Sequence, residues 1–201
     1  MNEYMRTDTA EDLISTLELS CEFLTKACLD DRYWKWFIYS VHAAVQSTAA
    51  LSLSGGNGFL VQKPSVMKRM LEAHANEGEP VAPHMDNFSR LIEKTLIKQN
   101  LWCYAEPILD TGHIKALQTL DELRDEFTHF NVKSWAIEKL HILECTNKAI
   151  DFVHHYVCVT YAIIWHEESH QKRVVIAIET LKSELEKLCT ESVLNQQTTK
   201  I

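Results

Sequence analysis

Glycine and proline are scarce in this chain, whose 201 residues include five glycines and four prolines. An all-β protein needs many more of them for its turns, whereas helices exclude both from their interior. Leucine, alanine, glutamate and lysine recur throughout instead. The composition therefore predicts an all-α protein, and an apolar content of 46% is enough for one sizeable core in a single domain.

Long apolar runs and an N-terminal targeting pattern are also missing. The most apolar stretch, residues 152–165, is 14 residues long and contains His154 and His155, so it is too short and too polar to span a membrane. Residues 1–6 do not show the basic and then apolar pattern of a secretion signal. We therefore expect a soluble cytoplasmic protein without membrane contacts.

No C-x-x-C pair occurs among the six cysteines, and several of them fall on apolar helix faces. This pattern predicts reduced thiols in the core and argues against disulfides and metal ligands. We expect neither a metal nor a cofactor. The cysteines are Cys21, Cys28, Cys103, Cys145, Cys158 and Cys189.

Positive charge is in deficit, because 20 lysines and arginines face 28 acidic residues and the net charge is −8. A protein that binds nucleic acid over a broad surface has the opposite sign. Any contact with RNA must therefore be local, such as a basic cleft inside an acidic body. A protein that never touches RNA fits the charge as well.

Apolar residues at helical period predict two helices near the N-terminus. Asp8 and Glu11 have the spacing of a capping box before a helix that continues to Cys28. Residues 30–31 are aspartates that can cap a second helix, and the glycine-rich residues 54–58 end it.

Residues 54–110 are less regular and contain all four prolines. Within them we expect short helices at 65–74 and 86–97. We interpret the region as an irregular insertion or flap within a single domain of residues 1–201.

Helical periodicity returns at Thr111 and predicts a helix that ends near His129. Asn131 or Ser134 can cap the next helix, which carries apolar residues as far as Ile164. Because these apolar residues lie on several sides, we expect that helix to be central.

A final helix shows an apolar stripe over residues 174–188, and we expect residues 195–201 to fray. The chain contains no internal repeat. The predicted fold is an up-and-down helical bundle with a partly irregular insertion after the second helix.

Arg124 and His129 combine a permanent cation with an imidazole that can transfer a proton, and this pair suits phosphodiester chemistry. Asp125 and His129 are four residues apart and can meet on the outward side of the helix. There the carboxylate would orient the imidazole and favour its protonated form. Thr128, four residues after Arg124, could supply a hydroxyl to the arginine or to a phosphate.

Residues 124–129, Arg-Asp-Glu-Phe-Thr-His, resemble the arginine-x4-histidine motif of the HEPN superfamily (higher eukaryotes and prokaryotes nucleotide-binding). Its members are small all-helical proteins that include many metal-independent endoribonucleases and ribonuclease toxins. The similarity continues through Phe130 and residues 133–138, which look like those of a subgroup of uncharacterised bacterial members. The resemblance implies RNA as the substrate, a role as a toxin or antiviral effector in bacterial defence, and an antitoxin or other regulatory protein as a partner.

The chemistry that fits this motif is cleavage of RNA by its own 2′-hydroxyl, which leaves a 2′,3′-cyclic phosphate without a metal. His129 would act as the base, and the His129 of a second copy as the acid. Arg124 would stabilise charge on the phosphoryl oxygens. Because Arg124 and His129 are about 140° apart on an ideal helix, a homodimer with two such helices across a twofold axis is the simplest way to place them on one phosphate. The predicted catalytic residues are Arg124, His129, Asp125 and Thr128.

Other interpretations stay open at this point. Arg69 and His74 repeat the same spacing in the proline-containing region. The acids around Arg124 would repel a polyanion, which fits a catalytically inactive HEPN-like dimer that binds nucleic acid or protein. Residues 166–170, His-Glu-Glu-Ser-His, match a zinc-protease motif, but the charged Glu168 inside it is unlike those helices.

Aromatic residues cluster at the start of the second helix and could stack a base, although their helical spacing also fits a core or a dimer surface. They are Trp34, Trp36, Phe37 and Tyr39. His42 and at least one of His154 and His155 are interpreted as hydrogen-bonded histidines of the core.

Overall fold

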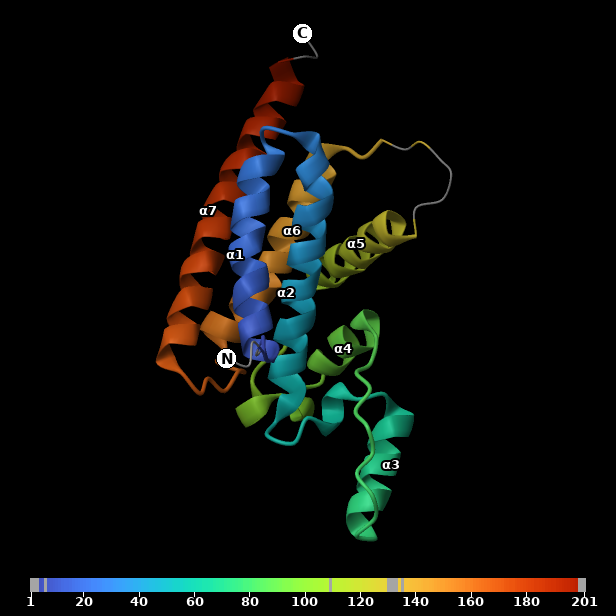
Figure 1. The fold of residues 1–201 in the computed structure, drawn as a ribbon. Coiled ribbons are helices and arrows are strands. Elements are labelled where there is room, and N and C mark those ends of the chain that lie inside the picture. The colour runs from blue at the N-terminus through green and yellow to red at the C-terminus, as the bar shows by residue number, and fades with distance from the viewer. Residues whose placement is uncertain (1–3, 6, 109, 130–133, 135, 199–201) are drawn as a thin grey trace.

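The computed structural model describes residues 4–5, 7–108, 110–129, 134 and 136–198 (Figure 1). These residues form helices α1 to α7, joined by turns and short 3-10 segments, and they include no β-strand. The all-α helical bundle predicted from the composition is confirmed. Within the same residues, no helix is long and apolar enough to cross a membrane.

Helices α1 (Thr9–Ala27) and α2 (Trp34–Ser54) form an antiparallel pair. The Asp8 side chain caps α1 by accepting hydrogen bonds from the first backbone N–H groups. Asp30 does the same for the 3-10 turn Asp31–Tyr33 that leads into α2. Gly55 ends α2 with a left-handed φ of 50°, a conformation that glycine adopts without strain. The start and end signals expected for both helices are confirmed.

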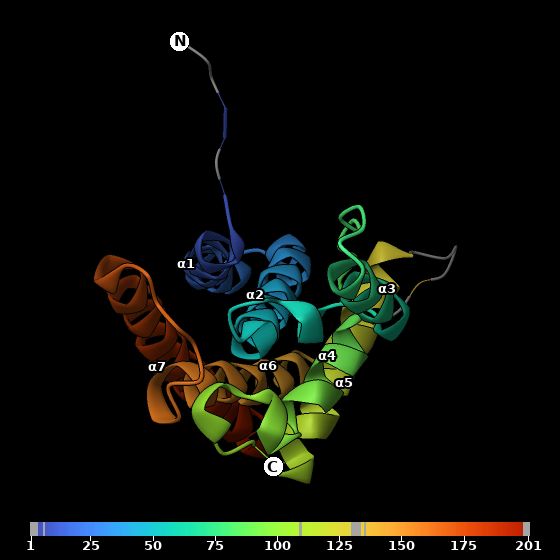
Figure 2. The same cartoon turned by 90° about the horizontal axis from the view of Figure 1, so that it is seen from below.

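The core lies among α1, α2, α6 (Lys139–His154) and α7 (Glu168–Thr198). Side chains from all four helices are fully buried there, among them Leu17, Val41, Ile150 and Leu181. Seen along the bundle, α6 lies between α7 on one side and α5 (Thr111–Thr128) on the other (Figure 2). Helix α6 is therefore central, as its apolar composition predicted.

The limits predicted for α6 are wrong. The helix begins at Lys139 after Glu138, and Ser134 lies outside it, while Asn131 falls outside the described residues. Its regular part ends at His154, followed by a π-helical turn over His155–Val159 and an irregular segment in which Ile164 lies.

Contacts with the insertion explain the early end of α6. The Tyr156 hydroxyl donates to the carbonyl of Thr95 at 3.0 Å, and the His155 ring contacts the carbonyl of Glu106 at 2.7 Å. The Thr160 hydroxyl then donates to the His155 carbonyl at 3.1 Å and competes with the helical ladder. An apolar sequence pattern carries no signal for these distant partners.

The insertion contains α3 (Pro64–Ala75) and α4 (Phe88–Thr95), followed by two 3-10 turns, Lys98–Asn100 (η3) and Trp102–Tyr104 (η4). The two short helices predicted here are confirmed, with shifted bounds. Helix α3 projects from the bundle (Figure 1), and Val66 is its one buried residue.

Helix α4, in contrast, packs against α2 and buries its apolar face in the core. Lys94 fastens it, because the ammonium group contacts the carbonyls of Leu60 and Gln62 at 2.9 and 2.8 Å and the Asp86 carboxylate at 2.9 Å. The insertion therefore has a projecting part and a part that belongs to the bundle.

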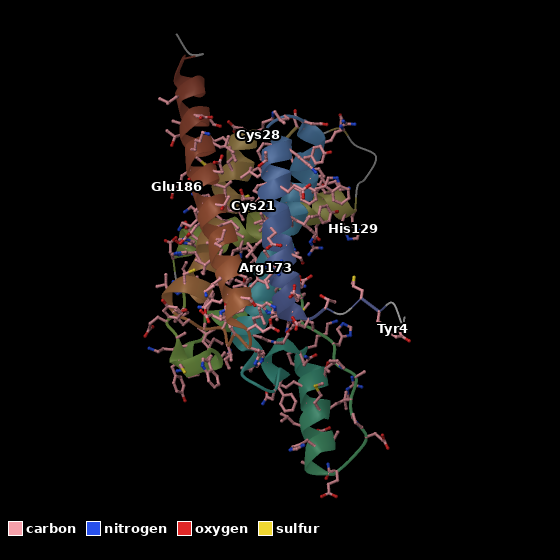
Figure 3. All side chains as sticks on the ribbon, turned by 60° about the vertical axis from the view of Figure 1, so that its left-hand side comes forward. Tyr4, Cys21, Cys28, His129, Arg173 and Glu186 are labelled. Atoms are coloured by element: carbon pink, nitrogen blue, oxygen red, sulfur yellow. The ribbon has the colours of Figure 1, made fainter. Side chains whose placement is uncertain are left out.

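All six cysteines are free, and four of them lie in the core or are packed against it, namely Cys145, Cys21, Cys158 and Cys189. Cys145 is buried, and burial raises the pKa of its thiol to about 12. Cys21 is half-buried, and burial raises its pKa to about 11. Cys28, at the end of α1 (Figure 3), and Cys103, in η4, are exposed, so the prediction of a core position is wrong for these two.

Candidate functional site

Helix α5 carries the arginine-x4-histidine pair. Asp110 caps its start, and Leu120 and Leu123 bury one side of it against the bundle. At the other end the His129 backbone N–H still bonds to the Asp125 carbonyl at 2.8 Å, but the His129 backbone has left the helical conformation. His129 therefore lies at the outer end of α5 with its ring exposed (Figure 3).

The Arg124 guanidinium is half-buried between two carboxylates. Its Nη2 lies 2.9 Å from Oδ1 of Asp121, and its Nη1 lies 2.6 Å from Oδ1 of Asp125. Asp121 is itself shared, because it also contacts His42 Nε2 at 2.9 Å and accepts from the Ser89 hydroxyl at 3.3 Å. One carboxylate thus joins α2, α4 and α5 around the arginine.

His42 is 5% exposed and stacks on Phe88, with ring centroids 4.1 Å apart and an angle of 22° between the planes. Burial lowers its pKa, and the hydrogen bond with Asp121 opposes that effect only in part. The neutral ring therefore donates its Nε2–H to Asp121. Because that nitrogen then has no free lone pair, its approach to Arg124 at 3.3–3.4 Å is a packing contact.

His42 and Asp121 had no functional role in the sequence-based prediction. His42 was interpreted as a core histidine, which its burial and its hydrogen bond bear out. The pair spans 79 positions of the chain, so no local spacing could have found it. Together with Ser89, these residues show that helix α4 of the insertion contributes directly to the surroundings of Arg124.

Thr128 fixes the last turn of α5. Its hydroxyl donates to the Arg124 carbonyl at 2.8 Å, and it lies 2.8 Å from the hydroxyl of Tyr39 on α2. Since the single proton of Thr128 is already used, the Tyr39 hydroxyl is the donor between them. Thr128 was expected to supply its hydroxyl to the arginine or to a phosphate, and its hydroxyl bonds to the backbone carbonyl of Arg124.

The predicted pairing of Asp125 with His129 is not formed in the described part of the chain. Asp125 binds Arg124, and no hydrogen bond or ion pair between described residues involves the His129 ring. The ring lines a shallow depression of about 240 Å³ together with Glu122, Asp125 and Glu126. The backbone leaves the helical conformation at His129, so Asp125 and His129 do not lie on one face of α5 as expected.

The second pair of the same spacing, Arg69 and His74, has different surroundings. Both side chains are exposed on the projecting helix α3, and neither takes part in an ion pair among the described residues. Equal spacing therefore corresponds to two very different environments, of which only the one around Arg124 is built from several helices.

The zinc-protease pattern at residues 166–170 does not form a metal site. Helix α7 begins at Glu168, so His166 and His170 do not lie on one helical turn. The His170 ring already pairs with Glu11 at 3.0 Å and Glu167 at 3.3 Å. Nowhere in the described ranges do three or more histidine, cysteine or acidic side chains gather closely enough to hold a metal ion.

Fold and site together define an all-α bundle in which a buried histidine, an aspartate and an arginine form a network beside an exposed histidine. No family model, curated protein or solved structure matches the chain. A function must therefore be argued from these residues.

Proposed function

We propose that this protein is a metal-independent endoribonuclease of the HEPN type. The observation that carries the proposal is the contrast between the two arginine-x4-histidine pairs. Arg124 is held by Asp125 and by Asp121, whose carboxylate also contacts α2 and α4, whereas Arg69 is an exposed side chain on α3. A fixed guanidinium and an exposed imidazole at the end of the same helix supply what phosphodiester cleavage needs, which is preorganised positive charge and a proton acceptor.

In the proposed reaction the His129 ring takes the proton from a ribose 2′-hydroxyl, whose oxygen then forms a bond to phosphorus. The bond between phosphorus and the 5′-oxygen breaks, and an imidazolium donates a proton to that leaving oxygen. Arg124 binds the phosphoryl oxygens as negative charge grows on them. The acid is the His129 of a second copy, in a homodimer whose α5 helices meet across a twofold axis.

The two carboxylates bound to Arg124 have separate roles in this scheme. Asp121 is the less exposed of the two and keeps Nη2 in place through its contacts with His42 and Ser89. Asp125 is more than half exposed and binds Nη1 from the solvent side. A substrate phosphate therefore replaces Asp125 on the guanidinium, while Asp121 keeps the side chain oriented.

Cleavage of RNA in the presence of EDTA tests the proposal. We expect the wild-type protein to release fragments that end in a 2′,3′-cyclic phosphate, and His129→Ala and Arg124→Ala each to lower the rate by on the order of 10² or more. Arg69→Ala and His74→Ala are matched controls at the same spacing and should retain the wild-type rate. Equal rates for His129→Ala and His74→Ala would contradict the proposal.

A second function, a catalytically inactive module that binds nucleic acid or protein, is favoured by one observation. Arg124 is already neutralised by two carboxylates, and the depression at His129 is lined by one of these, Asp125, and by two further acidic residues, Glu122 and Glu126. In that case the same assay shows RNA that is bound but stays intact with every variant.

A further inference from the structure

The N-terminal part of α2 exposes an aromatic surface next to the end of α5. Trp36 is 49% exposed, although tryptophan normally buries most of its ring. Its ring centroid lies 5.9 Å from that of Tyr39, with 37° between the two planes. The Lys35 ammonium lies 5.4 Å from the centroid of Trp36 and 5.6 Å from that of Tyr39. Lys35, Trp36 and Tyr39 are called the aromatic platform below.

Of the aromatic cluster, for which a core, a dimer surface and base stacking were all open, only half lies in the core. Trp34 and Phe37 point into the bundle, where they are buried and meet edge to face. Trp36 and Tyr39 fall on the other side of the same helix. Packing in the core therefore does not explain why positions 36 and 39 are aromatic.

The platform is joined to the candidate site by a hydrogen bond. The Tyr39 hydroxyl donates to Thr128, which is the last residue of α5 and the neighbour of His129. The platform is therefore attached to the end of α5 that carries His129. The acids Glu122, Asp125 and Glu126 lie around His129 as well, and they repel a polyanion that approaches over them.

We propose that the aromatic platform is the subsite that binds a base of single-stranded RNA next to the cleaved phosphate, and this inference rests on the proposed function. Aromatic rings stack on unpaired bases of any sequence, which is the usual way in which proteins bind single strands. Lys35 contributes the charge for the adjoining phosphate, because it has no carboxylate partner within the described part of the chain. The charge of Arg124 is balanced by two carboxylates, so the phosphate that adjoins the stacked base needs a second cation.

Binding of a fluorescein-labelled single-stranded RNA of mixed sequence tests this subsite. All proteins carry His129→Ala so that the RNA stays intact, and anisotropy gives the dissociation constant. We expect Trp36→Ala to weaken binding about tenfold, as the loss of one stacked base implies, and Trp36→Phe to keep most of the affinity. Lys35→Gln should lower the dependence of binding on salt.

Trp102→Ala is the matched control, because Trp102 is 43% exposed but lies in η4 and not on α2. It should bind RNA like the parent protein. Equal affinity of the Trp36→Ala and Trp102→Ala proteins, or a parent protein that does not bind RNA, overturns the inference. So does a Trp36→Ala protein that keeps its affinity but changes its mass in light scattering, since the platform is then a subunit interface.

The two proposals can fail separately. If wild-type protein cleaves RNA but Trp36→Ala does not change RNA affinity, the proposed base-binding subsite is wrong and the proposed ribonuclease activity stands. If RNA binds through Trp36 but is never cleaved, the enzyme is wrong and the platform belongs to a binding module.

Discussion

At the scale of single residues, Asp121 holds the candidate site together. It contacts a buried histidine, an arginine and a serine that come from three different helices. Of these groups, His42 is buried, and without Asp121 its Nε2–H would lose its hydrogen-bond acceptor, which costs more than a hydrogen bond contributes. The orientation of Arg124 therefore depends on residues that the motif itself does not contain.

His42 should make stability depend on pH near neutrality. Its pKa in the folded protein lies below the ordinary value of 6.5, mainly because the ring is buried, so the unfolded chain binds more protons between those two values. The stability contribution of the neutral ring is therefore present above pH 6.5 and is lost as the pH falls through the folded-state pKa. We expect His42→Gln to lose less stability than wild type between about pH 7.5 and pH 5 in urea unfolding.

The exposed His141→Gln is the control for this measurement and should follow the wild-type curve. If the free energy of unfolding changes with pH in the same way for wild type and His42→Gln, the pKa of the buried ring is not lowered by folding.

Sequence reasoning at this scale found one half of the site and missed the other. Arg124 and His129 were found because their spacing matches a known pattern. His42 and Ser89 reach the site from other helices, and their contacts depend on packing that no single segment encodes. The expected Asp125–His129 pair failed for a related reason, since an ideal helix was assumed to continue through a residue at which the real helix ends.

At the scale of elements, Lys94 fastens the insertion to the bundle. Its partner Asp86 has a side chain that is 3% exposed, so loss of the lysine leaves a buried carboxylate without its charge partner. We expect Lys94→Met to lower the free energy of unfolding by about 3 kcal/mol and to make residues 76–84 cut faster in limited proteolysis.

A double variant, Lys94→Met with Asp86→Leu, removes both charges and should recover most of that stability. If the single and double variants are equally unstable, the loss comes from lysine packing and the two backbone contacts, and not from the unpaired carboxylate.

Helices with a clear cap and an apolar stripe were predicted well, as α1 and α2 show. The end of α6 was not, because its apolar run continues while hydrogen bonds to Glu106 and Thr95 take the backbone out of the helix. Periodicity therefore identified which segments are helices, whereas distant contacts decided where one of them stops.

At the scale of the whole molecule, the proposed enzyme requires the histidines of two copies, and a mixed dimer tests this. A heterodimer of one wild-type and one His129→Ala subunit keeps a single histidine in the shared cleft, so it lacks either the base or the acid of the proposed reaction. We expect it to cleave RNA on the order of 10² more slowly than the wild-type homodimer. The heterodimer is obtained by co-expression with two different tags, and cleavage is followed in EDTA.

A rate that falls only in proportion to the number of histidines kept would mean that each subunit works alone. Light scattering on the wild-type protein provides the control, since a monomeric mass at assay concentration excludes a shared cleft.

The distribution of the cysteines makes this bundle suitable for distance measurements by energy transfer. Cys28 and Cys103 are the exposed thiols, and they lie in separate elements, Cys28 at the end of α1 (Figure 3) and Cys103 in η4. The thiolate is the form that reacts with maleimide dyes, so burial protects Cys21 and Cys145, whose pKa values are raised to about 11 and about 12. Partial burial also raises the pKa of Cys28, which slows its labelling relative to an unshifted thiol. The native sequence can thus carry a donor and an acceptor fluorophore at two defined positions without any added cysteine.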